Sequence, residues 1–175
     1  MIKNIVSILV TTAVLLGSIV AVTAVVGLTL PESHQIARSA RFSAPPSAVY
    51  AVISDVAHYA DWRSDIDRIE VLPDDGEGVR FAEYAGEDVV TYRIEEATPP
   101  TRLKVRIDDA SLPFGGTWTY LLQPLEGGTS LTITEDGTIG NPIFRVIAKV
   151  LFSPTDSMDR YLHDLSGIES LGGRR

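Results

Sequence analysis

The chain has 175 residues, 45% of them hydrophobic, with 15 Lys and Arg against 23 Asp and Glu and a net charge of −8 at pH 7. This length and composition predict one folded domain with a hydrophobic core and exclude an intrinsically disordered chain. The acidic net charge does not fit a nucleic-acid partner, because binding to phosphates needs clustered Lys and Arg. The chain has no cysteine, which excludes disulfides, thiolate metal ligands and thiol nucleophiles.

The chain starts with a long uncharged segment. From Asn4 to Pro31, between Lys3 and Glu32, a run of 28 residues carries no charge and consists mainly of Ile, Val, Leu, Ala and Thr. As a helix this run would extend about 40 Å, enough to cross a hydrocarbon core of roughly 30 Å. We therefore predict a transmembrane anchor over residues 1–30, in contact with the membrane through residues 4–30, and a separate domain over residues 31–175.

A cleaved signal peptide is the alternative for this segment. The apolar region of such a peptide usually has about 7–15 residues, and here the run continues past the passable cleavage site Val22-Thr23-Ala24. Lys3 favours an N-terminus inside the cell, whereas Arg38 and Arg41 behind the segment oppose that orientation. Because a short tail ahead of an apolar segment is typical of a signal anchor, we expect a single-pass membrane protein with its domain outside the cytoplasm.

The region after Pro31 begins with a strand and two short helices. Residues 36–42 alternate between apolar and polar side chains, which predicts the strand. The Pro-rich stretch 43–47 ends it, and Ser43 or Ser47 is expected to cap the first helix. The apolar positions of this helix recur at spacings of three and four: Val49, Val52, Ile53 and Val56. The second helix is expected through residues 58–62, with Asp55 as its N-cap.

Beyond Ser64 the chain alternates between short strands and turn sequences. The turn sequences are residues 73–76, 85–88, 99–100, 113–116 and 126–128, and their spacing predicts an antiparallel meander of about six strands. One face of this sheet is expected to be apolar and aromatic and the other polar.

A long helical stretch closes the chain. Asn141 is the predicted N-cap and Pro142 the first helical residue. An apolar stripe follows: Ile143, Val146, Ile147, Val150 and Leu151, then Met158, Tyr161, Leu162, Leu165 and Ile168. Ser153-Pro154 predicts a kink or a restart of the helix, and Gly172-Gly173 is its expected end. The fold class is therefore α+β, with a curved antiparallel sheet of about seven strands around a long C-terminal helix, the helix-grip arrangement.

Three segments resemble one protein superfamily. Residues 41–55, followed by Tyr59, Trp62 and Arg63, resemble the opening of the SRPBCC superfamily, the START-related group of polyketide cyclases/dehydrases and lipid-transport proteins. Residues 128–135 resemble the penultimate strand of that family and residues 161–165 its closing helix, so that the likeness covers about residues 34–171. It implies a deep apolar cavity, between sheet and C-terminal helix, for a small lipid-like, aromatic or polyketide-like molecule. It implies no fixed catalytic set, because the members range from enzymes to binding modules.

Nine apolar or aromatic residues are the candidates for lining this cavity. They lie on the apolar phase of the strands and on the C-terminal helix: Phe81, Tyr92, Leu103, Val105, Trp118, Tyr120, Ile133, Ile147 and Leu151. A core filled by these side chains would give the same pattern. A strongly curved sheet around one helix is nevertheless difficult to fill at native packing density, which favours a cavity.

Two carboxylates interrupt the apolar phase, Glu83 beside Phe81 and Glu135 beside Ile133. An unpaired carboxylate on an apolar face is costly, so each should be protonated, paired or exposed. The candidate partners of Glu135 are Arg38 and Arg145, and the alternative is a bulge or strand end that turns Glu135 outward. With Tyr120, both carboxylates are weak candidates for general acid/base catalysis of a cyclisation or dehydration.

Other polar groups give no further site. The histidines, His34, His58 and His163, have no metal-ligand spacing, and nucleotide-binding and hydrolase motifs are absent from the sequence, so we expect neither a metal nor a cofactor. We expect Tyr59 and Trp62 to pack in the core, with Arg63 facing solvent. Residues 144–152 are expected to pack on the sheet, with contact to a bilayer surface as the alternative.

These observations favour a membrane-anchored module that binds or transfers a small hydrophobic molecule without chemistry. The first alternative is an enzyme of the cyclase/dehydratase type that uses a cavity carboxylate. The second is an interaction domain whose cavity is filled by its own side chains. The pattern carries no expectation for the oligomeric state.

Overall fold

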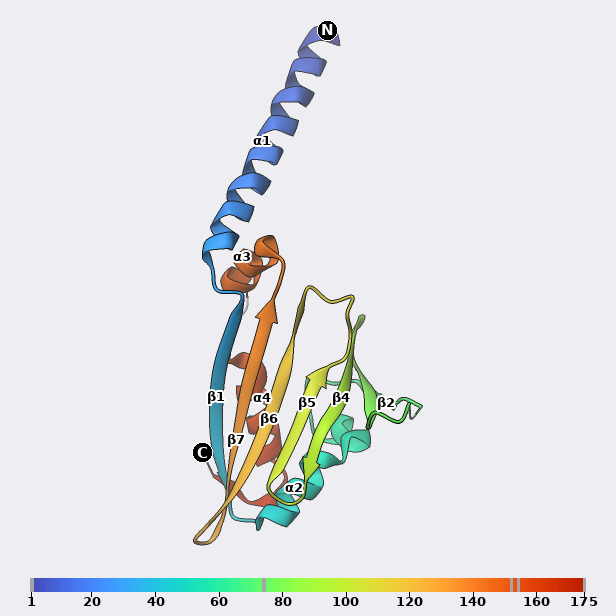
Figure 1. The fold of residues 1–175 in the computed structure, drawn as a ribbon, viewed down its shortest axis with the longest axis vertical. Helices are drawn as coiled ribbons and strands as arrows, with labels where there is room; N and C mark the ends of the chain where they lie inside the picture. The colour runs from blue at the N-terminus through green and yellow to red at the C-terminus, as the bar shows by residue number, and fades with distance from the viewer. Residues whose placement is uncertain (1, 74, 152, 154, 175) are drawn as a thin grey trace.

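The computed structural model of the protein describes residues 2–73, 75–151, 153 and 155–174 (Figure 1). The elements are, in order, α1 (Ile2–Thr29), β1 (Ser33–Phe42), α2 (Pro46–Ser54), the short 3-10 helix η1 (Val56–Asp61), β2 (Arg68–Val71), β3 (Arg80–Ala85), β4 (Asp88–Thr98), β5 (Arg102–Ile107), β6 (Phe114–Leu125), β7 (Gly128–Ile139), α3 (Pro142–Leu151), α4 (Asp156–Ser166), η2 (Glu169–Leu171) and β8 (Gly173–Arg174).

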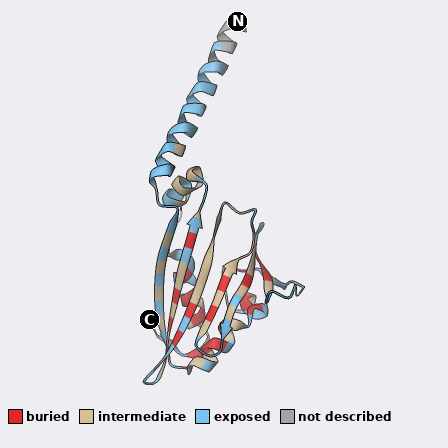
Figure 2. Cartoon of the chain, viewed as in Figure 1, coloured by how far each residue is buried: buried red, intermediate tan, exposed pale blue. Residues whose placement is uncertain are grey.

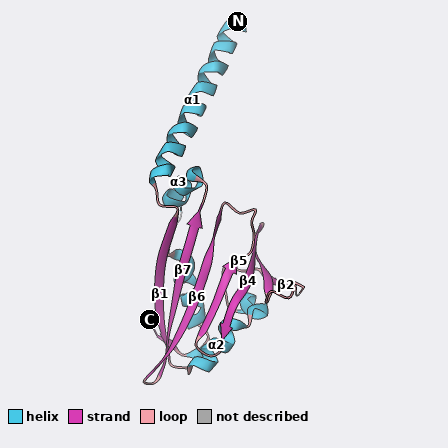
Figure 3. Ribbon diagram, viewed as in Figure 1, coloured by secondary structure: helices cyan, strands magenta, loops and turns pink. Residues whose placement is uncertain are grey.

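The strands form one antiparallel sheet in the order β2-β3-β4-β5-β6-β7-β1-β8. β7 pairs with β6 from Gly128 to Ile139 and with β1 from Thr129 to Thr138, without a shift of register. β8 pairs with β1 only at Arg41 and Phe42, so the remainder of this edge of β1 has no strand partner among the described residues. The sheet and its helices confirm the predicted α+β helix-grip fold, with seven longer strands and the two-residue β8 (Figure 3).

The helix α1 extends away from one end of the sheet (Figure 1). Its segment Leu9–Thr29, 21 residues long, is the only helix in the described part of the chain that is long and apolar enough to cross a membrane. The described side chains of this segment are mostly exposed to solvent rather than packed on the domain (Figure 2).

The caps of the first short helices differ from the prediction. Pro45 precedes α2 and Pro46 occupies its first turn, without a side-chain cap. Proline needs no hydrogen bond there because it has no N–H and its φ already suits a helix. The predicted cap Ser43 instead donates to the carbonyl of Gly172 at 3.1 Å. Asp55 does precede η1, but its carboxylate pairs with Nδ1 of His58 at 2.9 Å rather than with the backbone.

The C-terminal helical stretch consists of two helices that lie in different places. Asn141 caps α3 as predicted, since its Oδ1 accepts from the amides of Ile143 and Phe144 at 2.9 and 3.1 Å. α3 contacts α1 at the end of the sheet, whereas α4 packs on the sheet. α4 ends at Ser166, before the predicted Gly172-Gly173, and η2 follows. Of the predicted break Ser153-Pro154, Pro154 lies outside the described residues.

Burial changes along the length of the sheet. The half nearer α2 is packed, with Tyr120 and Leu122 of β6 and Leu131 and Ile133 of β7 buried (Figure 2). Towards α3 the next inward residues of the same strands, Trp118 and Glu135, are only half-buried. The core is therefore closed at the α2 end and more accessible at the α3 end.

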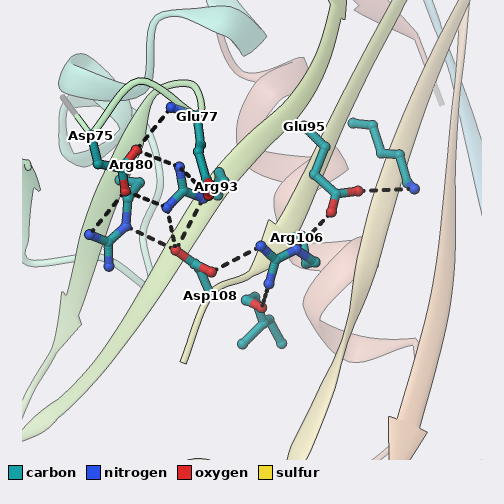
Figure 4. A network of polar contacts seen from close by, with 9 residues as sticks. Asp75, Glu77, Arg80, Arg93, Glu95, Arg106 and Asp108 are labelled. Atoms are coloured by element: carbon teal, nitrogen blue, oxygen red, sulfur yellow. Dashed lines mark hydrogen bonds and ion pairs between the residues drawn. The ribbon is translucent and has the colours of Figure 1, made fainter. Parts of the chain in front are cut away.

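The outer face of β3, β4 and β5 carries a network of ion pairs (Figure 4). The guanidinium of Arg93 is buried there because residues 75–77 fold over it, and it donates to both carboxylate oxygens of Asp75 at 2.8 and 2.6 Å. Asp108 accepts from Arg93 and Arg80 and pairs with Arg106. The hydrogen bonds from Arg93 hold the pKa of Asp75 well below its usual range.

Candidate ligand-binding site on the inner face of the sheet

Seven of the nine predicted lining residues lie together on the face of the sheet that α4 covers, which we call the inner face. The strand register makes them neighbours: Phe81 lies opposite Tyr92, Val105 opposite Trp118, and Tyr120 between Leu103 and Ile133. All seven belong to, or pack against, one hydrophobic cluster. Five strands therefore contribute a continuous apolar and aromatic band.

The other two predicted residues, Ile147 and Leu151, do not face the sheet. They lie on α3 and are 40% and 69% exposed. The expected packing of this segment on the sheet is confirmed at Phe144, whose ring stacks on Phe114 of β6 at a centroid distance of 5.9 Å. It is not confirmed at Ile147 and Leu151, because the helix lies at the end of the sheet and mainly contacts α1.

Tyr161 of α4 is the centre of an aromatic cluster on the inner face. Its ring contacts Tyr59, Trp62, Trp118 and Tyr120 at centroid distances of 6.3, 5.1, 5.8 and 5.6 Å. Tyr59 and Trp62 pack edge to face, which confirms their predicted place in the core. The sequence placed Tyr161 on the apolar stripe of the last helix but gave no reason to select it as a site residue.

The hydroxyl of Tyr161 is buried and has no hydrogen-bond partner among the described residues. The hydroxyls of Tyr59 and Tyr120 lie close enough to this oxygen to interact with it electrostatically, but neither meets it in hydrogen-bonding geometry. The hydroxyl of Tyr59 donates instead to the carbonyl of Ile53 at 2.6 Å. Burial raises the pKa of Tyr161 well above its ordinary value, so the group is a neutral hydroxyl that can donate or accept.

Glu135 points to the inner face and connects two other side chains. Its Oε2 accepts from Nε1 of Trp118 at 2.7 Å, and its Oε1 lies 3.0 Å from Nε2 of His34. The expected arginine partners are elsewhere, since Arg38 pairs with Asp159 and Arg145 with Glu32. The alternative of an outward turn is also wrong, because the β7 ladder continues through Glu135 without a bulge.

His34 was missed as a member of this group. It lies opposite Gly137 in the strand register, and its imidazole covers the position that a side chain at residue 137 would occupy. A glycine opposite a histidine on a neighbouring strand leaves room for the imidazole. This weak signal for the position of His34 can be recognised only when the strand register is known. The side chains of His34 and Glu135 are 36% and 21% exposed, so this polar pair is accessible from the α3 end.

Glu83 forms a buried ion pair with Arg63. The distance from Arg63 Nη1 to Glu83 Oε1 is 2.7 Å, and each side chain is 10% exposed. The guanidinium also binds Asp65 and lies over the rings of Tyr59 and Tyr161. The prediction that Arg63 faces solvent is therefore wrong. Burial raises the pKa of Glu83, and the charge of Arg63 opposes that rise.

The three acid/base candidates differ in access to solvent. Glu83 is enclosed with Arg63, and Tyr120 is buried, which raises the pKa of its hydroxyl well above the ordinary value. Glu135 is the most exposed of the three. Within the described ranges, no three His, Asp or Glu side chains are grouped so that they could hold a metal ion.

A depression of about 570 Å³ lies beside the aromatic cluster, between η1 and the end of α4. Its lining includes Trp62, His163 and Asp164. Asp164 accepts from both the amide and the hydroxyl of Ser64 at 2.7 Å, which fixes this border. Trp62 lines the depression and its ring is also in contact with Tyr161.

Comparisons with known proteins agree with this architecture. Residues 33–160 match the family described as polyketide cyclase / dehydrase and lipid transport. A comparison with curated proteins found no match. Solved structures with the same fold include truncated norcoclaurine synthase from Thalictrum flavum (14% identity, TM-score 0.63, 77% of this chain and 91% of that chain). An aromatase/cyclase from a Streptomyces species follows (13% identity, TM-score 0.59, 77% and 92%).

A START superfamily protein from Mycobacterium smegmatis is similar to the same extent (15% identity, TM-score 0.59, 77% of this chain and 95% of that chain). At these identities the structural likeness establishes the fold alone. The family match covers more than half of the chain and fits the curved sheet with its apolar inner face. The chain therefore belongs to the polyketide cyclase / dehydrase and lipid transport family.

Proposed function

We propose that the protein is a membrane-anchored module that binds or transfers a small hydrophobic molecule on the inner face, between the sheet and α4. The observation that carries this proposal is the buried, unpartnered hydroxyl of Tyr161 in the centre of an aromatic cluster. Leaving a buried hydroxyl without a partner costs about 1–3 kcal/mol. A ligand with one hydroxyl, carbonyl or carboxyl group would recover this cost.

The surroundings of Tyr161 support an apolar ligand with a polar end. The rings of Trp62, Trp118 and Tyr120 supply apolar surface around the hydroxyl. His34 and Glu135 supply a second polar point at the accessible end of the inner face. The family description names both lipid transport and polyketide cyclisation, and lipid-like, aromatic and polyketide-like molecules all combine an apolar body with a few oxygens.

The proposed anchor is residues 1–30, and the proposed binding domain is residues 31–175. α1 supports the anchor because Leu9–Thr29 is long and apolar enough to cross a membrane. The location of the domain outside the cytoplasm stays a prediction from the short N-terminal tail.

The binding proposal can be tested with cis-parinaric acid, a fluorescent polyene fatty acid, and the full chain in detergent. Both tryptophans of the chain contact Tyr161, so their emission reports directly on the site. We expect saturable energy transfer from tryptophan to one bound probe. Tyr161→Phe should weaken binding roughly 2- to 10-fold, as expected for one lost hydrogen bond, while the folded state is as stable as the parent or more so.

Tyr84→Phe is the matched control. The Tyr84 hydroxyl bonds to Glu70 on the exposed side of the molecule, so its removal should leave probe binding unchanged. Energy transfer that does not saturate, or that is equal in the parent and Tyr161→Phe, would contradict the proposed site.

A second candidate, an enzyme of the cyclase/dehydratase type, is favoured by the contact of Glu135 with His34. A carboxylate beside an imidazole, both partly accessible, can move a proton at a bound carbonyl compound. Here Glu135→Gln should still bind an aromatic polyketide substrate but no longer convert it. Equal turnover in parent and variant would exclude Glu135 as the acid/base.

A further inference from the structure

The helix α3 carries the most exposed large apolar side chains of the region that follows α1. Val150 and Leu151 are 74% and 69% exposed, and Ile147, one turn earlier, is 40% exposed. Elsewhere beyond α1, no described large apolar side chain exceeds the 51% of Val71. Residues spaced by three and four lie on one face of a helix, so these three form a continuous surface, which we call the α3 patch. Such a patch marks contact with another apolar surface.

The position of α3 is fixed against the end of α1. Arg145 donates to the carbonyls of Gly27 and Leu30, both at 3.4 Å, and forms an ion pair with Glu32 at 3.2 Å. The last carbonyls of a helix have no partner within it, so an arginine at this end stabilises it. The two helices also touch directly, because a side chain at Gly27 would collide with the backbone of Pro142.

The contact with Gly27 places α3 at a defined level of the membrane. The 21 residues of the apolar segment Leu9–Thr29 would extend about 31 Å, close to the roughly 30 Å of a hydrocarbon core. Gly27 lies within the last turn of α1, where the helix leaves the hydrocarbon. With α1 as the anchor, the start of α3 therefore lies at the boundary between acyl chains and head groups, and the α3 patch follows within the next turns of this helix.

We propose that α3 is an interfacial helix whose patch rests on the lipid leaflet that α1 leaves. This inference rests on the proposed anchor, and the partner to which it commits is the phospholipid surface itself. The side chain of Lys149, exposed in the last turn of α3, lies at the level of the phosphates, where a lysine is favourable.

In this arrangement the accessible end of the ligand site faces the membrane. The accessible end of the inner face, with His34, Trp118 and Glu135, is the end nearer α3 and α1 (Figure 2). With α3 on the leaflet, a hydrophobic molecule passes between the bilayer and the inner face without crossing bulk water.

Single-cysteine labelling tests this orientation, and the chain is suited to it because it has no native cysteine. Val14→Cys in α1, Val150→Cys in α3 and Leu125→Cys are each labelled with the fluorophore NBD in the full chain. The proteins are then reconstituted into phosphatidylcholine vesicles. Leu125, 41% exposed, is the control, because the turn between β6 and β7 lies at the end of the sheet far from α1 (Figure 1). Each label is tested with doxyl-labelled phosphatidylcholine and with aqueous iodide.

We expect doxyl lipid to quench most of the emission at positions 14 and 150, and iodide to quench position 125. If position 14 is not quenched by doxyl lipid, the anchor itself is wrong and the inference fails with it. If position 14 is quenched but position 150 responds only to iodide, the anchor stands and the interfacial role of α3 is refuted. Protection of position 150 from both quenchers would also refute it, since protein would then cover the patch.

Discussion

The buried pair of Arg63 and Glu83 makes a strong prediction about stability. Arg63→Met keeps the aliphatic stem but leaves the Glu83 carboxylate, 10% exposed, without its counter-charge. Removing one partner of a buried ion pair costs about 3–5 kcal/mol. The lost bonds to Asp65 add less, because that carboxylate is 21% exposed and can be hydrated. We therefore expect the free energy of unfolding to fall by about 3–5 kcal/mol at pH 7.

The converse change, Glu83→Gln, should cost less, because Arg63 keeps two hydrogen bonds to Asp65. One charge-assisted bond becomes a neutral one, with an expected loss of about 1–2 kcal/mol. The double variant Arg63→Met/Glu83→Met removes both buried charges and should be more stable than Arg63→Met alone. Urea unfolding of the full chain in detergent, followed by tryptophan emission, measures all three.

The pH dependence gives a further check on the same pair. Burial raises the pKa of Glu83 above its ordinary value of 4.5, and without Arg63 that rise is no longer opposed. A raised pKa in the folded state means that protonation stabilises the fold at low pH, and that this contribution is lost as the pH rises through the folded pKa. The loss in the free energy of unfolding of Arg63→Met, relative to the parent, should therefore become smaller as the pH is lowered from 7 to 5. A double variant that is no more stable than Arg63→Met, together with a loss for Arg63→Met that does not change with pH, would refute the coupling.

Three other perturbations have defined outcomes. Glu135→Leu leaves the indole N–H of Trp118 without its acceptor and should lower the free energy of unfolding by about 1–3 kcal/mol in the same urea assay. Glu135→Gln should lower it less. Equal stability of the parent and the two variants would contradict this role of Glu135. Asp75→Asn should destabilise the protein at pH 7. Because Arg93 lowers the pKa of Asp75, the difference in the free energy of unfolding between parent and variant should become smaller as the pH falls below 3.8. A difference that does not change with pH would argue against the ion pair. Deleting residues 1–31 should release the protein from the membrane fraction. Because it removes the direct contact of α1 with α3 and two of the four carbonyls that accept from Arg145, it should also speed hydrogen exchange in α3 but not in α4. Unchanged exchange in α3 would mean that α1 does not hold it.

The parts of the fold that could be predicted are those set by local pattern. Alternation in β5, β6 and β7 identified the inward residues Val105, Trp118 and Ile133, because a side-chain period of two fixes the face once a strand is recognised. Asn141 was predicted as a cap because its role depends only on the residues that follow it.

The parts that could not be predicted depend on contacts across the chain. Arg63 and Glu83 are 20 residues apart, and only the pairing of the strands and the position of η1 bring them together. His34 meets Glu135 across 101 residues for the same reason. The apolar stripe of α3 resembles that of α4, and periodicity alone does not say whether such a face meets protein or lipid.

The uncovered edge of β1 has a consequence for contacts between copies of the protein. On this side residues 33–40 have no strand partner in the described part of the chain, and of their backbone groups the carbonyl of Ala37 accepts from Arg38. An edge without a partner strand can recruit another strand. With α1 in a bilayer, every copy stands in the same direction, and two β1 edges that met would run parallel. Antiparallel pairing, the slightly more stable kind, would require one copy to be inverted in the membrane. The proposed anchor would therefore disfavour aggregation through antiparallel pairing of this edge.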